Sequence, residues 1–120
     1  MIIKLAKTQE EYKKCTDFLT RHKAPILANT ILFYIEDIGN NGEQILCVAG
    51  YNKEFGGAIE PLYSDNLRAT ERMYDFMCGF IMGMGNMIIR ARSEDEKVIH
   101  LLTERLGFKH YNNNEYFKEI

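Results

Sequence analysis

The sequence predicts an α+β fold in which a mixed, mostly antiparallel sheet is flanked by helices. The composition is that of a folded domain, with 46% hydrophobic and 27% charged residues among 120. Along the chain, apolar residues alternate between the spacing of strands and the spacing of helices. The resulting order is strand, helix, three strands, helix, strand, helix and two strands. This order favours one sheet covered by helices, in an α/β three-layer sandwich.

Length and charge limit the possible functions. Residues 1–120 correspond to one domain, since a domain usually takes about 100–200 residues. Fifteen Lys and Arg against 17 Asp and Glu give a net charge of −2, which provides no bulk attraction for nucleic acid or an anionic membrane. No signal peptide and no membrane-spanning run is recognisable. We therefore expect a cytoplasmic protein without a nucleic-acid or membrane partner.

The first elements follow from a capping signal and a periodic run. Ile2 to Leu5 favours a short strand. Thr8 and Glu11 have the spacing of a capping box, which predicts a helix over residues 9–22, and Pro25 ends the helical region. The apolar face expected for this helix consists of Tyr12, Cys15, Phe18 and Leu19.

A hairpin and a further strand come next. Residues 30–36 are rich in β-forming residues, residues 44–49 form a second apolar run, and residues 39–42 between them are a turn signal. Residues 58–63 predict another strand, which Pro61 interrupts. A proline inside a strand implies an edge, a bulge or a splayed end.

The clearest helical periodicity begins after Asp65 or Asn66, either of which can cap the helix, and Gly83 and Gly85 end it. Gly79 and Gly83 have the spacing of a small-residue dimer face, so a homodimer stays open, but we expect them to permit close packing on the sheet. The apolar stripe is more typical of a core face than of a pliable partner groove. It consists of Met73, Phe76, Met77, Phe80, Ile81 and Met84.

The last third predicts a strand, a helix and a hairpin. Residues 87–89 favour a buried strand, and Ser93 and Glu96 have the spacing of a second capping box. Residues 108–111 and 116–120 favour two short strands around an asparagine turn. The inner face of the helix and its C-terminal cap are expected at Ile99, Leu102, Leu106 and Gly107.

Cysteine and histidine spacing predicts neither a disulfide framework nor a metal site. The three cysteines are far apart and form no Cys-x-x-Cys pair. Cys15 and Cys78 fall on apolar helix faces, where a free cysteine is usually a small core residue. The three histidines show no metal-ligand spacing either, and they are His22, His100 and His110.

Residues 93–108, SEDEKVIHLLTERLGF, together with the hairpin that follows, resemble the end of the GNAT superfamily of N-acetyltransferases. That family shows an Asn, an apolar helix that carries a Tyr, then Gly-Phe and a hairpin. The order of elements over the whole chain is the stronger part of the match. The resemblance implies one GNAT-like domain that transfers an acetyl group from acetyl-CoA to an amine, either a small molecule or a protein amine.

The family binds the acyl-CoA pyrophosphate at a helix start, where backbone N–H groups are free. The resemblance assigns this role to Asn66, Leu67, Arg68, Ala69 and Thr70. The usual motif is Gln or Arg, two residues, Gly, one residue, then Gly or Ala, but the corresponding stretch here contains no glycine. The side chain of Asp65 or Asn66 can occupy the same donors.

Two arginines near the start of this helix leave two interpretations open. Arg68 and Arg72 lie in the first turns, where a cation opposes the helix dipole unless an anion is near. They either clamp a phosphate or pair as solvated side chains with neighbouring carboxylates. The carboxylates available for such pairs are Asp65, Glu71 and Asp75.

The catalytic positions also depart from the family. The family Asn aligns with Glu96, and the Tyr that often protonates the leaving thiolate aligns with Thr103, whose hydroxyl is a poor general acid. Glu60, on the strand before the helix start, is the candidate base, and a solvated strand carboxylate is the alternative. The backbone N–H groups of the strand would polarise the acyl oxygen, and they belong to Leu62, Tyr63 and Ser64.

The missing glycine and tyrosine favour a second hypothesis, a GNAT-fold protein that has lost catalysis and acts by binding. Small phage proteins are similar in shape, so such a protein would be a phage virion component or would bind a host factor, in the host cytoplasm. An unrelated α+β binding module is a third possibility.

Overall fold

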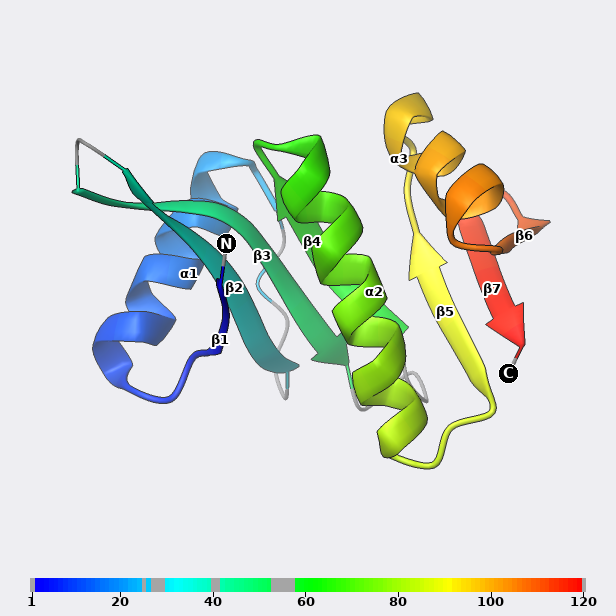
Figure 1. The fold of residues 1–120 in the computed structure, drawn as a ribbon, viewed down its shortest axis with the longest axis horizontal. Helices are drawn as coiled ribbons and strands as arrows, with labels where there is room; N and C mark the ends of the chain where they lie inside the picture. The colour runs from blue at the N-terminus through cyan, green and yellow to red at the C-terminus, as the bar shows by residue number, and fades with distance from the viewer. Residues whose placement is uncertain (1, 25, 27–29, 40–41, 53–57, 120) are drawn as a thin grey trace.

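In the part of the chain that the structure describes, seven strands form one sheet with the spatial order β1-β2-β3-β4-β5-β7-β6 (Figure 1). The computed structural model describes residues 2–24, 26, 30–39, 42–52 and 58–119. All neighbouring strands are antiparallel except β4 and β5, which are parallel. The predicted element order and an α+β fold with a mostly antiparallel sheet are confirmed. The elements are β1 (Ile2–Leu5), α1 (Gln9–Arg21), β2 (Thr30–Gly39), β3 (Gly42–Asn52), β4 (Ala58–Ser64), α2 (Leu67–Gly83), β5 (Ile88–Arg92), α3 (Glu96–His100) with its π-helical continuation η2 (Leu101–Arg105), β6 (Lys109–Asn112) and β7 (Glu115–Glu119).

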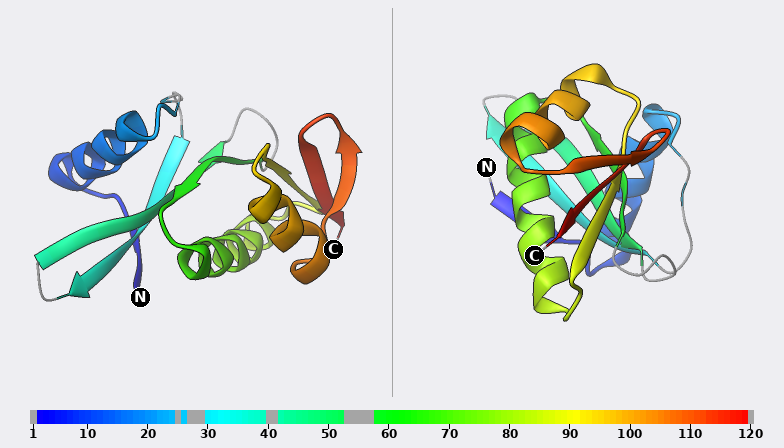
Figure 2. Two further views of the ribbon diagram at one scale, coloured as in Figure 1. Left: turned by 90° about the horizontal axis from the view of Figure 1, so that it is seen from above. Right: turned by 90° about the vertical axis from the view of Figure 1, so that its right-hand side faces the viewer.

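The two faces of the sheet are covered by different helices (Figure 2). Successive strand residues point to opposite faces, so Leu32 and Tyr34 pack with α1, whereas Phe33 and Ile35 pack with α2. The larger core lies between the sheet and helices α2 and η2, and Met73, Met77 and Leu102 are fully buried in it. The methionine stripe of α2 is thus a core face along most of its length.

Burial was predicted wrongly for the residues at the ends of the two apolar stripes. Tyr12 is 42% exposed although Glu11 in the same turn of α1 accepts a hydrogen bond from Tyr34 of β2, and Met84 is 54% exposed because it is the C-cap residue, beyond the last turn of α2. Gly79 and Gly83 do not pack on the sheet as expected, since both are exposed residues of α2 with nothing within 4 Å of an added Cβ. None of the described helices has the length and apolar character needed to cross a bilayer.

Helix α1 begins as predicted. The hydroxyl oxygen of Thr8 accepts a hydrogen bond from the Glu11 amide, and the Glu11 carboxylate accepts one from the Thr8 amide, which confirms the capping box. The helix ends at Arg21, one residue before the predicted end. Pro25, the centre of the hairpin turn at residues 40–41 and the loop at residues 53–57 lie outside the described residues.

Two predictions in the last third were wrong in detail. The strand predicted at residues 87–89 is β5, which starts at Ile88, and Met87 is 69% exposed. Only alternate β5 residues are buried, because a helix covers one face of this strand. The cap of α3 is Asp95, whose carboxylate accepts from the Lys97 amide, so no Ser93–Glu96 capping box forms. The predicted cap at Gly107 is supported by its left-handed φ of +78°.

Candidate functional site

The candidate site lies where the parallel strands β4 and β5 separate. These strands pair through Ala58 with Arg90 and through Ile59 with Ala91. Beyond Ile59 the described residues contain no further pairing between them, although β4 continues to Ser64. The separation begins directly before Pro61, the residue from which the sequence predicted a bulge or a splayed end.

A β-bulge in β4 accompanies the separation. Tyr51 of β3 lies opposite Ile59, but Ala49 lies opposite Leu62. One residue of β3, Gly50, is therefore opposite two residues of β4, Glu60 and Pro61. Such an insertion bends a strand and redirects its side chains.

Gly50 is required by the close approach of the bulge. A Cβ added to Gly50 would lie 2.7 Å from the carbonyl oxygen of Glu60 and 2.9 Å from Cδ of Pro61. Both distances are well below van der Waals contact, so no larger residue fits without movement of β4. Because Gly50 has no side chain, the bulge of β4 can pack closely against the backbone of β3.

The free edge of β4 presents backbone groups to the gap. The Asp65 amide donates to the Leu46 carbonyl at 2.8 Å, so these residues form a hydrogen-bonded pair of the antiparallel ladder. Pairs in such a ladder alternate, and those in between direct their backbone groups away from the partner strand. The N–H and C=O groups of Leu62 and Ser64 therefore point away from β3, toward the side where β5 has separated.

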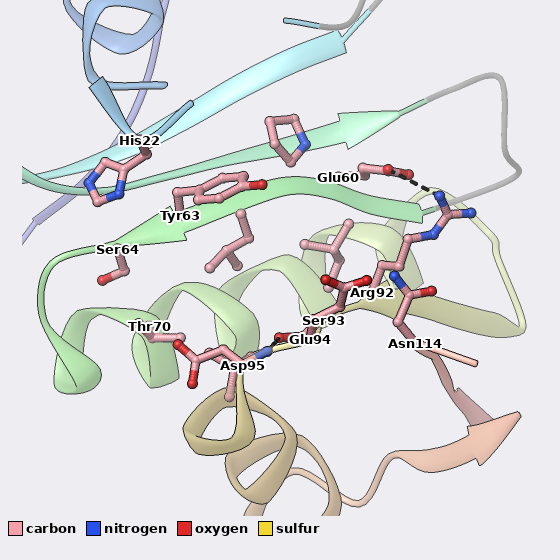
Figure 3. Close-up of a pocket in the computed structure, with 14 residues that line it drawn as sticks. His22, Glu60, Tyr63, Ser64, Thr70, Arg92, Ser93, Glu94, Asp95 and Asn114 are labelled. Atoms are coloured by element: carbon pink, nitrogen blue, oxygen red, sulfur yellow. Dashed lines mark hydrogen bonds and ion pairs between the residues drawn. The ribbon is translucent and has the colours of Figure 1, made fainter. Parts of the chain in front are cut away.

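A cavity of about 450 Å³ occupies this region (Figure 3). Its volume is in the range of small-ligand sites. It brings together residues from β4, the start of α2, the β5–α3 connection and the β6–β7 turn. The lining residues are His22, Ile59, Glu60, Pro61, Leu62, Tyr63, Ser64, Thr70, Arg92, Ser93, Glu94, Asp95, Val98 and Asn114.

The predicted base, Glu60, lines this cavity and has a cationic partner. Its carboxylate lies 3.5 Å from Nη1 of Arg92, while Nη2 of Arg92 lies 2.8 Å from the carboxylate of Glu115. The Glu60 side chain is 23% exposed, so it is not a freely solvated strand carboxylate. Arg92, at the end of β5, connects three strands at the point where the gap opens.

The start of α2 keeps two free backbone donors. The side chain of Asn66 caps the helix by accepting from the Ala69 amide at 3.0 Å, and the Asn66 amide itself donates to Oγ of Ser64 at 3.1 Å. The amides of Leu67 and Arg68 have no acceptor among the described residues. Of the five backbone donors assigned to a pyrophosphate, those of Asn66, Ala69 and Thr70 are occupied, and those of Leu67 and Arg68 are open.

The carboxylates near this helix start have other partners. Asp65 pairs with Arg21 at 2.9 Å and lies 2.9 Å from Nε2 of His22, so it is directed toward α1. Glu71 pairs with Arg105 at 3.2 Å. Of the two interpretations that the sequence left open, the pairing of these arginines with neighbouring carboxylates is therefore not found. Both arginines are exposed and form no ion pair within the described part of the chain, and they are Arg68 and Arg72.

Glu96 and Thr103, at the positions that align with the family Asn and Tyr, do not take over the roles of those residues. Glu96 is an exposed residue at the start of α3. The hydroxyl of Thr103 donates to the Ile99 carbonyl at 2.9 Å within its own helix. Neither residue lines the cavity.

The sequence did not single out four polar residues of the cavity. His22 caps the end of α1, Arg92 ends β5, Asp95 caps α3 and Asn114 lies in the last turn. A helix cap or a strand end has no chemical signature of its own, so only the packing of four separate segments reveals that these side chains meet. The predicted capping box at Ser93 and Glu96 was the one sequence signal close to these cavity residues.

The cysteines take no part in the site. Burial raises the pKa of the Cys15 and Cys47 thiols to about 12 and also raises the pKa of Cys78. All three are free and buried, which makes them unreactive core residues. Among the described residues no three His, Cys, Asp or Glu side chains converge as metal ligands would.

No protein-family model matches the chain, and a search of curated proteins finds no match to it.

Proposed function

We propose that this chain is an acyl-CoA-dependent N-acyltransferase of the GNAT type, which transfers an acetyl group from acetyl-CoA to an amine. The observation that carries the proposal is the separation of β4 from β5 at a bulge, with a cavity in the resulting gap. An acyl-CoA needs a slot in which an extended, amide-containing arm can lie against a strand edge. The element order and the helices on both faces of the sheet are consistent with this fold.

The free edge of β4 matches the arm of the substrate. The pantetheine arm of CoA contains two amides, which can pair with backbone groups of Leu62 and Ser64 as a neighbouring strand would. At the end of this edge the chain turns into α2, where the amides of Leu67 and Arg68 are open and the helix dipole favours an anion. The pyrophosphate would bind there, with the Arg68 side chain as a further donor.

We assign to Glu60 the removal of a proton from the amine that accepts the acetyl group. The amine nitrogen attacks the thioester carbonyl, a C–N bond forms, and the C–S bond breaks with its electron pair going to sulfur. The carboxylate of Glu60 takes the proton that the nitrogen loses, directly or through water. The backbone N–H groups on the edge of β4 stabilise the oxyanion that develops on the carbonyl oxygen.

A second candidate is a GNAT-like protein that binds without catalysis, whether as a phage virion component or as a ligand of a host factor. The observation that favours it is the hydrogen bond of Thr103 to Ile99, since it leaves no acidic hydroxyl at the position where the family places its proton donor. The glycine-free helix start, with its capping Asn66, points the same way.

Calorimetry with CoA and acetyl-CoA separates these candidates. For the acyltransferase we expect a dissociation constant of about 1 μM to 1 mM, the usual range for enzyme substrates. Arg68→Glu should weaken binding by at least about tenfold, because it replaces a donor to phosphate with a repelling charge. Arg90→Glu, a charge reversal on an exposed strand residue, is the matched control. Absence of heat at millimolar CoA would refute the proposal.

The base is tested by Glu60→Gln. This variant keeps the shape of the side chain but cannot accept a proton, so turnover should fall by about 10²-fold or more while CoA affinity is retained. Glu119→Gln, at an exposed position of β7, is the control and should leave both unchanged. Unchanged turnover in Glu60→Gln would show that Glu60 is not the base.

A further inference from the structure

The end of α2 and its connection to β5 carry a group of exposed methionines. Three of the six methionines of the chain, Met82, Met84 and Met87, lie close together in the sequence MGMGNM. Their side chains are between 47% and 69% exposed. Met73 and Met77, on the same helix, are fully buried, as is usual for a flexible apolar side chain that fills a core. Core packing therefore does not account for the three exposed methionines.

A tight turn ends α2 in the middle of this group. Met84 is the C-cap residue, and Gly85 follows it with a left-handed φ of +87°. The Gly85 amide donates to the Met82 carbonyl at 2.9 Å. The Asn86 amide donates to the Ile81 carbonyl at 3.4 Å, and the side-chain amide of Asn86 donates to the same carbonyl at 3.3 Å. The two backbone bonds are those of the Schellman motif, so the turn is a defined part of the fold.

The turn returns Met87 to the end of the helix that carries the other two methionines. Figure 1 shows the chain reversing here, since β5 runs back alongside α2. An added Cβ at Gly83 or Gly85 meets none of the described residues within 4 Å, apart from its immediate neighbours, so the space around the turn is open. Met82 and Met84 leave the helix in different directions, but each side chain has three rotatable bonds. The thioether groups can therefore meet at the open end of α2.

The donors at this place are soft. A thioether sulfur is uncharged and polarisable, and ligands of this kind select Cu(I) rather than Mg²⁺ or Ca²⁺. The thiols do not compete, because all three cysteines are buried. Within the described ranges no three His, Cys, Asp or Glu side chains are grouped so that they could hold a metal ion. The exposed soft donors of the described chain are thus these thioethers.

We propose that Met82, Met84 and Met87 form a binding site for a soft monovalent metal ion, Cu(I), for which Ag(I) is a redox-inert substitute. Binding forms metal–sulfur bonds only. It releases no proton and changes no oxidation state, because a thioether has no proton to lose and the ion enters as Cu(I). None of the three residues lines the cavity between β4 and β5, so the site does not depend on the acyltransferase function.

A silver titration followed by NMR of ¹³C-methyl methionine tests the site directly. In chloride-free buffer, Ag(I) should shift the methyl signals of Met82, Met84 and Met87 and reach saturation at about one equivalent, as expected for a single metal site. The signals of Met73 and Met77 should stay in place, because both side chains are buried. Unchanged signals of the three exposed methionines at excess Ag(I) would refute the proposal.

Leucine variants distinguish a metal site from an apolar surface. Met84→Leu and Met87→Leu keep the apolar character and the approximate size of the side chain but remove the sulfur. In competition with a chromophoric Cu(I) chelator, each should lower the affinity by at least about tenfold, since loss of a group behind a metal ligand already costs about 10–100-fold. Met77→Leu, the same exchange in the buried stripe, is the matched control and should keep the wild-type affinity. Wild-type affinity after Met82→Leu, Met84→Leu and Met87→Leu are combined would overturn the assignment.

The pH dependence identifies the donor type. The Ag(I) affinity of a thioether site should change by less than about threefold between about pH 5 and pH 8, because no ligand has to lose a proton. Imidazole or thiolate ligands must be deprotonated, so a site built from them loses affinity as the pH falls. A steep loss of affinity toward acid would show that the ion binds to other groups and that the proposal is wrong.

Discussion

Substitution of Gly50 by alanine tests the packing that opens the site. The added Cβ would lie 2.4 Å from Cγ2 of Thr30, 2.7 Å from the carbonyl oxygen of Glu60 and 2.9 Å from Cδ of Pro61. Ordinary contacts of this kind begin near 3.4 Å, so β4 must move by several tenths of an ångström. Two of the three obstructing atoms belong to the bulge backbone or the proline ring, which cannot rotate away.

Overpacking of this kind costs about 1–3 kcal/mol. We expect a value of about 2–3 kcal/mol for Gly50→Ala, because strand backbone on β4 rather than a flexible side chain must shift. Urea denaturation followed by circular dichroism measures this change in the free energy of unfolding. Calorimetry on the same variant should also show weaker CoA binding, since the strand edge that faces the gap is displaced.

Gly79→Ala is the control, and its expected change in the free energy of unfolding has the opposite sign. Gly79 lies inside α2 on its solvent side, with nothing within 4 Å of an added Cβ. Alanine there should stabilise the protein by about 0.5–1 kcal/mol through its better helix propensity. If Gly50→Ala proves as stable as wild type, the bulge does not pack against β3 as described and the argument for an ordered gap is lost.

Two further predictions concern acid stability and thiol reactivity. The hydrogen bond that Tyr34 donates lowers the pKa of Glu11 from its ordinary value of 4.5, so the ionised carboxylate contributes stability above that pH and loses it as the pH falls through the lowered pKa. The wild type should therefore lose stability more steeply than Glu11→Gln below about pH 4.5 in urea titrations, and parallel curves would contradict this. Because burial raises the pKa of Cys15 and Cys47 to about 12, a thiol reagent at pH 8 should react only after unfolding, and stoichiometric reaction with the native protein would disprove their burial.

Local signals in the sequence predicted the order of the elements well. Capping spacing located the start of α1 at Thr8, and the methionine stripe located α2, because both signals arise from contacts within a few residues. The buried positions at the ends of stripes, such as Met84, were predicted wrongly. Periodicity indicates which side of a helix faces the core, but not how far along the helix the sheet extends.

The candidate site was predictable only in part. Pro61 indicated an irregular strand, and the predicted residues Glu60, Leu62, Tyr63, Ser64 and Thr70 do line the cavity. The other residues assigned to the pyrophosphate, Asn66 to Ala69, do not line it, and Ala69 is fully buried. The partners of Glu60 were not predictable, since Arg92 reaches it from a strand that is distant in sequence. The role of Gly50 was also hidden, because a glycine in an apolar strand gives no indication of which backbone will approach it.

The short parallel contact between β4 and β5 divides the sheet into two halves. On one side lie β1 to β4, and on the other β5, β7 and β6, each held by antiparallel ladders within its own half. Within the described chain the two halves are joined by two residue pairs, by the ion pair between Glu60 and Arg92 and by the packing of α2. Local opening at this junction would therefore break few contacts. A compound bound between β4 and β5 would contact both halves of the sheet and would hold them together. Its binding would slow amide exchange on both flanks of the opening and raise the melting temperature by mass action.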